Sequence, residues 1–105
     1  MGVRRKARFI TFEGIEGCGK STQVRRLARR MKTLGIPLVT TREPGGTPIG
    51  QGIRRILLDA GNRNLSPLGE LLLYGADRAQ HVRDVILPAL TQGTWVLCDR
   101  FSDAT

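Results

Sequence analysis

Apolar residues along this chain occur in two patterns, short continuous runs and helical spacings. The runs at residues 7–13, 36–41 and 94–98 predict three buried strands, the first of them containing Phe9, Ile10 and Phe12. Between the first two runs, apolar positions recur at intervals of three and four, which predicts an amphipathic helix closed by Gly35. Its apolar stripe comprises Val24, Leu27, Ala28, Met31 and Leu34.

Two further helices are expected between the second and third strands. A helix over residues 49–58 should turn Ile49, Ile53, Ile56 and Leu57 inward. A long helix should begin after the capping residue Ser66, with Pro67 at its first position, where proline is favoured. Pro88 should kink or split this helix and Gly93 should end it. The buried side of the long helix is predicted to carry Leu71, Leu72, Ala76, Ala79 and Val82.

The resulting order, β-α-β-α-α-β, predicts an α/β fold with a parallel, doubly wound sheet and right-handed crossovers. In such sheets ligands bind at the carboxyl ends of the strands. All three predicted strands end in polar residues, at Glu13, at 41–43 and at 99–100. We therefore expect a polar ligand site along this edge.

Length and composition describe one small domain over residues 1–105, with a basic tail at residues 1–7. No apolar stretch is long enough for a membrane span, and no apolar segment of a secretory signal follows the basic start. With only two cysteines, Cys18 and Cys98, we expect reduced, small buried side chains and a cytoplasmic location.

The net charge of +8 permits two interpretations, nucleic-acid binding or arginines that hold small phosphates beside a solvated helix face. The fourteen arginines are spread through the chain, and no nucleic-acid-binding pattern is present. The second interpretation is favoured, with no nucleic-acid partner. The solvated face is expected to comprise Arg25, Arg26, Arg29, Arg30 and Lys32.

Residues 14–21 fit the phosphate-binding pattern G-x-x-x-x-G-K-[ST] at every fixed position, between a predicted strand and a predicted helix. The glycines let backbone N–H groups face phosphate oxygens, and the helix start adds its own N–H groups. Lys20 would bind the β and γ phosphates and Ser21 would ligate Mg²⁺. The predicted nucleotide-binding residues are Gly14, Ile15, Glu16, Gly17, Cys18, Gly19, Lys20, Ser21 and Thr22.

Three residues at the other strand ends suit the same chemistry. Asp99 is expected to support Mg²⁺, directly or through water; alternatively it caps a helix or pairs with Arg100. Arg42 and Arg100 are planar donors suited to bidentate phosphate binding, unless they are simple surface arginines.

Four blocks in order resemble the bacterial thymidylate kinase family. They are residues 9–23, which include the P-loop; Thr41-Arg42-Glu43-Pro44-Gly45-Gly46-Thr47; residues 70–82, with Ala-Asp-Arg-Ala-Gln at 76–80; and Asp99-Arg100-Phe101. The second and third blocks are the specific ones, because the P-loop alone indicates only a nucleoside triphosphate. The resemblance implies phosphoryl transfer from ATP to dTMP, with Mg²⁺ as cofactor.

The resemblance also implies residue roles. Lys20, Asp99 and Arg100 would be catalytic, with Ser21 and Asp99 at the metal. Arg42 would hold the dTMP phosphate and Arg100 would bridge it to the transferring group. Tyr74, where Phe is usual, would stack on thymine, and Arg78 would bond a thymine carbonyl. Glu16 and Thr105 would lie near the acceptor sugar or base. His81 is expected on the helix exterior or at a cap, without a catalytic role.

Some positions depart from the family pattern. Phe101 replaces Tyr or His, and Ala104 replaces a frequent Ser. Gly17 stands where some members carry a basic residue, and in the family this goes with a catalytic arginine supplied by a lid. Members run to about 200 residues with five strands and are commonly homodimers, whereas this sequence ends after the third strand. The open alternatives are another P-loop kinase, or a non-catalytic nucleotide-binding fragment.

Overall fold

The computed structural model describes residues 6–14, 20–62 and 64–101. Three strands form one parallel sheet in the order β1-β3-β2. They are β1 (Phe9–Gly14), β2 (Leu38–Glu43) and β3 (Trp95–Phe101). The parallel α/β class and the predicted element order are confirmed, although β2 and β3 each extend two to three residues further than predicted. These added residues bring Arg42, Glu43, Asp99 and Arg100 into the strands.

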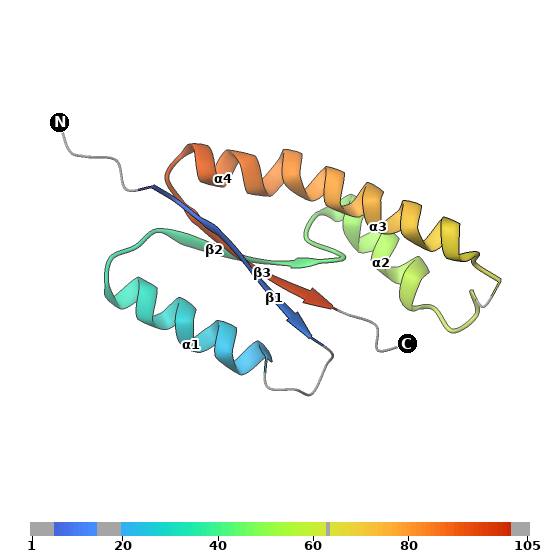
Figure 1. Ribbon diagram of the computed structural model, residues 1–105, viewed down its shortest axis with the longest axis horizontal. Coiled ribbons are helices and arrows are strands. Elements are labelled where there is room, and N and C mark those ends of the chain that lie inside the picture. Colours follow the sequence, from blue (N-terminus) through green and yellow to red (C-terminus); the bar gives the residue numbers. More distant parts are fainter. Residues whose placement is uncertain (1–5, 15–19, 63, 102–105) are drawn as a thin grey trace.

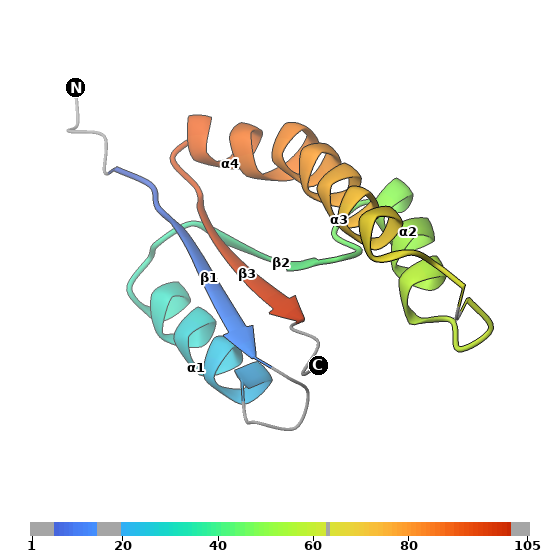
Figure 2. The same cartoon turned by 45° about the vertical axis from the view of Figure 1, so that its right-hand side comes forward.

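Helices cover both faces of the sheet (Figure 1). Helix α1 (Lys20–Thr33) lies on one face, and the long helical segment that precedes β3 lies on the other. That segment comprises α3 (Pro67–His81), a π-helical turn η1 (Val82–Ile86) and α4 (Leu87–Thr91). Helix α2 (Pro48–Leu58) packs against α3 at the far end from β1, as the rotated view also shows (Figure 2).

The core lies on both sides of β3, which is the middle strand. Val96, Leu97 and Cys98 are each completely buried. Val96 packs against Ile86 and Ala89, and successive residues of a strand point to opposite faces, so Leu97 points toward the α1 face. Val24 and Met31 supply the buried apolar side chains of α1. The basic side chains at 25, 26, 29, 30 and 32 are exposed, as predicted.

Helix boundaries follow the predicted local signals. Ser66 caps α3 through a bond from the Gly69 N–H, Pro67 stands in the first turn, and Thr47 caps α2 in the same way. Gly35 and Gly93 follow α1 and α4 with positive φ angles of 74° and 80°. Pro88 does not break the long helix outright. The chain widens into the π-helical turn just before it, with the Leu87 N–H bonded to the Val82 carbonyl.

The predicted inward faces of the helices were partly wrong. Leu34 lies beyond the end of α1 and is exposed. Ile49 and Ile56 on α2 are exposed as well. On α3, Leu71 and Leu72 are 66% and 64% exposed, and Ala76 and Ala79 are exposed as well. The buried residues of α3 are instead Asp77 and His81, one helical turn apart. The helix turns this polar pair toward the end of β2, where both side chains find hydrogen-bond partners. His81 is therefore interior, which corrects its expected place on the exterior.

Gly50 allows α2 to pack closely against Asp77 of α3. A Cβ added to Gly50 would lie 2.4 Å from Asp77 Oδ1 and 3.0 Å from Thr47 Oγ1, whereas one added to Gly52 would meet only the end of Arg55 at 3.7 Å. In the complete polypeptide that contains these residues, Gly50→Ala should therefore destabilise the fold by about 1–3 kcal/mol through overpacking.

The matched control is Gly52→Ala on the same helix, which should be neutral or stabilising, because alanine favours helix over glycine by about 1 kcal/mol. Urea unfolding of both variants measures the difference. Equal stabilities would contradict the close approach of α2 to Asp77.

Candidate active site at the carboxyl edge of the sheet

The three strands present their polar ends side by side. In the parallel register, Glu13 is paired with Arg100, Arg100 with Glu43, and Asp99 with Arg42. The convergence predicted from the strand pattern is thus present. Because side chains alternate along a strand, Asp99 and Arg100 point to opposite faces of the sheet.

Lys20, at the start of α1, lies between the ends of β1 and β3. Its ammonium group donates to the carbonyl of Gly14 at 3.0 Å and to that of Arg100 at 2.7 Å. It also forms an ion pair with Asp99, with Nζ 2.6 Å from Oδ1. With a side chain only 10% exposed, Lys20 is held between the ends of β1 and β3.

Most of the phosphate loop lies outside the described residues. This applies to Ile15, Glu16, Gly17, Cys18 and Gly19, to the side chain of Ser21, and to Thr105 and Ala104 near the end. Gly14 ends β1, and Thr22 is exposed in the first turn of α1. The roles predicted for the residues outside the described ranges stay predictions.

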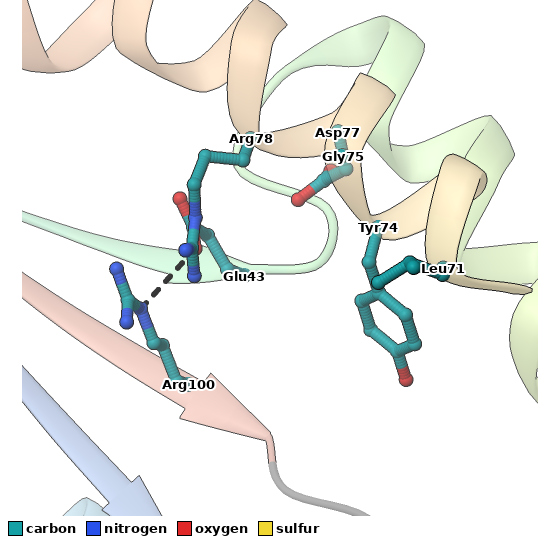
Figure 3. Close-up of a pocket in the computed structure, with 7 residues that line it drawn as sticks. All are labelled: Glu43, Leu71, Tyr74, Gly75, Asp77, Arg78 and Arg100. Atoms are coloured by element: carbon teal, nitrogen blue, oxygen red, sulfur yellow. Dashed lines mark hydrogen bonds and ion pairs between the residues drawn. The ribbon is translucent and has the colours of Figure 1, made fainter.

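Arg78, Arg100 and Tyr74 line one cavity of about 270 Å³ on the α3 side of the sheet edge, together with Glu43 and Leu71. Figure 3 shows both guanidinium groups beside Glu43 and the Tyr74 ring projecting from α3, apart from them. Three of the predicted acceptor-binding residues therefore come together.

Arg42 belongs to a different hollow, of about 410 Å³, which it lines with Asp99, Arg25 and the loop glycines. Its Nε donates to the Gly45 carbonyl at 3.3 Å. The predicted acceptor residues are thus divided between two hollows, one on each face of the sheet edge.

Glu43 was not singled out from the sequence, yet its carboxylate is the most connected in the site. It is buried, and the peptide bond that follows it, to Pro44, is cis. Oε1 accepts from Arg78 Nε at 3.1 Å and Nη2 at 2.9 Å, and Arg100 Nε lies 3.2 Å away in an ion pair. Oε2 lies 2.7 Å from His81 Nδ1. The Thr-Arg-Glu-Pro block was the only available signal, and it could not indicate these distant partners.

These contacts decide the charge of Glu43. Burial by itself raises the pKa of the carboxyl, but the hydrogen bonds from His81 and Arg78 and the charges of Arg78 and Arg100 outweigh it and leave the pKa below its ordinary value. Glu43 is therefore ionised near neutral pH and acts only as an acceptor. It follows that His81 Nδ1 carries the proton of that bond.

The other polar residues beneath the site complete this network. His81 Nε2 lies 2.9 Å from Thr41 Oγ1. Asp77 Oδ1 accepts from the Gly45 N–H at 2.9 Å. Burial raises the pKa of Asp77, with the nearby charge of Glu43 acting in the same direction and the Gly45 bond opposing it.

Glu43, His81 and Cys98 are the one group of potential metal ligands within the described ranges, with ligand atoms within 4.8 Å of one another. Glu43 and His81 already use these atoms for hydrogen bonds. Burial raises the pKa of the Cys98 thiol to about 11, although a hydrogen bond with Thr41 opposes this, so without a metal ion Cys98 is a neutral thiol. In this structure the side chains of Glu43 and His81 belong to a hydrogen-bond network.

None of the helices within the described ranges is both long and apolar enough to cross a membrane. The sequence model of the thymidylate kinase family matches residues 12–105. A thymidylate kinase of Geobacter sulfurreducens is 63% identical over 97 residues, which cover 92% of this chain and 46% of that protein. One from Pelobacter propionicus is 64% identical over 97 residues, covering 92% and 44% respectively.

A solved structure agrees with the sequence comparisons. The thymidylate kinase of Ehrlichia chaffeensis superimposes with a TM-score of 0.80 at 43% identity, over 92% of this chain and 55% of that one. The chain spans about half the length of the curated relatives that it matches. With the family model covering most of its residues, the chain belongs to the thymidylate kinase family.

Proposed function

We propose that the polypeptide containing this chain transfers the γ-phosphoryl group of ATP to dTMP, giving ADP and dTDP. An oxygen of the dTMP phosphate forms the new bond to the γ phosphorus, and the bond from that phosphorus to the β,γ-bridging oxygen breaks. The observation that carries the proposal is the convergence of Lys20, Asp99, Arg42 and Arg100 at one sheet edge in a chain of this family.

Lys20 acts on the donor side. Its ammonium group, fixed between Gly14 and Arg100 carbonyls, would exchange its contact with Asp99 for oxygens of the β and γ phosphates. It offsets the negative charge that spreads over the phosphoryl oxygens in the transition state. The backbone N–H groups at residues 14–19 and at the start of α1 would bind the remaining phosphate oxygens.

Asp99 fits the Mg²⁺ that this chemistry uses. Its buried Oδ1 has the Lys20 ammonium 2.6 Å away as its charged partner, and carboxylate oxygens are preferred ligands of this ion. Asp99 and the hydroxyl of Ser21 would hold the ion, directly or through water. When bound, Mg²⁺ would supply positive charge that offsets the charge of the phosphate oxygens.

The acceptor side uses the arginines and the aromatic ring. Arg42 and Arg100 flank Asp99 and would bind the dTMP phosphate from the two faces of the edge. Tyr74 would stack on thymine in the cavity that it shares with Arg78. Arg78 is 52% exposed and keeps N–H groups beyond those bonded to Glu43, which could reach a thymine carbonyl. Glu16 and Thr105 are proposed to lie near the sugar or base.

The same proposal includes a homodimer in the cytoplasm that acts on small molecules rather than on nucleic acid. The large exposed fractions of Leu68 and Leu72 on α3 support a protein partner, and the free buried thiol of Cys98 supports a reducing compartment. The spread of the fourteen arginines over residues 4–100 supports the absence of a nucleic-acid site. Sedimentation equilibrium of the complete polypeptide tests the dimer.

The substrate is tested by ADP release from the complete polypeptide with a panel of nucleoside monophosphates. The rate with dTMP should exceed that with dCMP by at least about tenfold. Arg78 is proposed to donate to a thymine carbonyl, and it would be left unpaired against a base that lacks the matching acceptor. Equal rates with the two would contradict the assignment of dTMP.

Replacing Lys20 by alanine should lower kcat by about 10²–10³-fold, the size of one lost electrostatic contact to the transition state. Circular dichroism should show that the fold is retained. Lys32→Ala, an exposed lysine on the same helix, is the control and should leave kcat unchanged. A Lys20→Ala enzyme with normal kcat would remove Lys20 from the chemistry.

Arg42→Ala should raise the KM for dTMP about tenfold or more and change the KM for ATP much less, because the proposed contact is to the acceptor phosphate. Arg26→Ala removes an exposed arginine of α1 and should change neither constant. Initial rates with each substrate varied in turn measure both constants, and an equal rise for ATP and dTMP would argue against an acceptor role.

A further inference from the structure

We propose that His81 is a positioning residue, which fixes the Glu43 carboxylate so that Arg78 and Arg100 are held at the acceptor cavity. The inference rests on the proposed function for the identity of the ligand. Its structural basis is independent of that identity, because every contact in it is made by the protein alone.

The first step is the convergence of two cations on one oxygen. Arg78 Nε and Nη2 lie 3.1 and 2.9 Å from Glu43 Oε1, and Arg100 Nε lies 3.2 Å from the same atom. Guanidinium groups this close repel each other unless an anion lies between them. Glu43 lies between the two guanidinium groups and offsets their repulsion, while Arg100 Nη1 also donates to the exposed Glu13 carboxylate at 3.1 Å (Figure 3 shows the two arginines beside Glu43).

The second step is the constraint on Glu43. A carboxylate bound through one oxygen could still turn about its side-chain bonds, and the two arginines would move with it. His81 Nδ1, 2.7 Å from Oε2, holds the second oxygen. The imidazole cannot turn either, because Nε2 is 2.9 Å from Thr41 Oγ1 and the ring is completely buried.

The third step is the close packing of the loop after β2 against the His81 ring. A Cβ on Gly46 would lie 2.8 Å from His81 Cδ2 and 2.7 Å from the Arg42 carbonyl oxygen. The loop after β2 thus packs directly on the imidazole edge. The position of His81 is thus fixed by Thr41 of β2, by the loop after β2 and by helix α3. Its hydrogen bond then fixes the position of the Glu43 carboxylate.

A general scaffold role would predict something different. Loss of a purely structural residue disturbs donor and acceptor binding together, whereas loss of a positioning residue acts on the side that its partners serve. The contacts of His81 lead through Glu43 to the guanidinium groups of Arg78 and Arg100 in the cavity with Tyr74, whereas Lys20 contacts Arg100 only at its backbone carbonyl. The acceptor constants should therefore change selectively.

The kinetic test is a double-mutant cycle in the complete polypeptide with His81→Asn and Glu43→Gln. His81→Asn should raise the KM for dTMP about tenfold, the scale of one lost hydrogen bond to a charged group, and change the KM for ATP less than about twofold. In the Glu43→Gln background it should add less than about twofold, because its route to the arginines is already removed. Equal effects on both substrates, or fully additive effects, would overturn the proposal.

Arg83→Ala is the control. Arg83 follows α3 within two residues of His81 but forms an exposed pair with Asp84, so its loss should change neither KM. If His81→Asn fails to fold, nitrogen NMR of the unmutated protein without substrate decides the question. A ring N–H signal on His81 Nδ1 and a protected Arg78 Nε–H are expected, and an unprotonated Nδ1 would overturn the proposal.

The NMR result also separates this inference from the proposed function. A folded His81→Asn variant that loses the Arg78 Nε–H protection supports the positioning role. If the unmutated protein is inactive on dTMP, that result overturns only the proposed function. Unchanged protection in that variant, together with normal dTMP kinase activity, would overturn positioning and leave the function standing.

Discussion

The carboxylate of Glu43 joins elements that are far apart in the chain. It stands at the end of β2, binds Arg78 and His81 from α3, and faces Arg100 from β3. A buried ion pair of this kind contributes little net stability, because desolvation of the charges offsets their attraction. Its value lies in geometry, since it joins α3 to the ends of β2 and β3 and leaves two guanidinium groups beside one cavity.

This constraint explains the unusual face that α3 buries. Apolar positions on the helix would ordinarily be turned inward, yet Asp77 and His81 occupy the interior and leucines face outward. Each interior polar group has a partner, Gly45 for Asp77 and Glu43 and Thr41 for His81. A fully satisfied network can replace apolar packing at such a place, whereas a partly satisfied one could not.

Local signals in the sequence were sufficient for the secondary-structure elements and for the convergence of polar strand ends at one edge. The capping residues Ser66 and Gly93, the strand-helix context of the P-loop and the polar strand ends are all readable within a few residues. The parallel register then brings Lys20 to Asp99. The role of Glu43 and the burial of His81 were not readable, because their contact joins residues 38 positions apart and depends on the rotation of a helix. Amphipathic spacing predicted the leucines inward, but it cannot indicate which of two possible faces meets the sheet.

Asp99 and Arg100 are neighbours in the central strand, yet their side chains face opposite sides of the sheet edge. Asp99 points toward the lysine of the phosphate loop, and Arg100 points toward Glu43 on the opposite face. The pleat of β3 thus directs two charged neighbours in the sequence to opposite faces of the sheet edge. A one-residue insertion or deletion ahead of Asp99 would exchange these faces and bury a charge against the wrong helix. This edge can therefore vary by substitution along β3, whereas a change in the length of the strand would exchange the two faces.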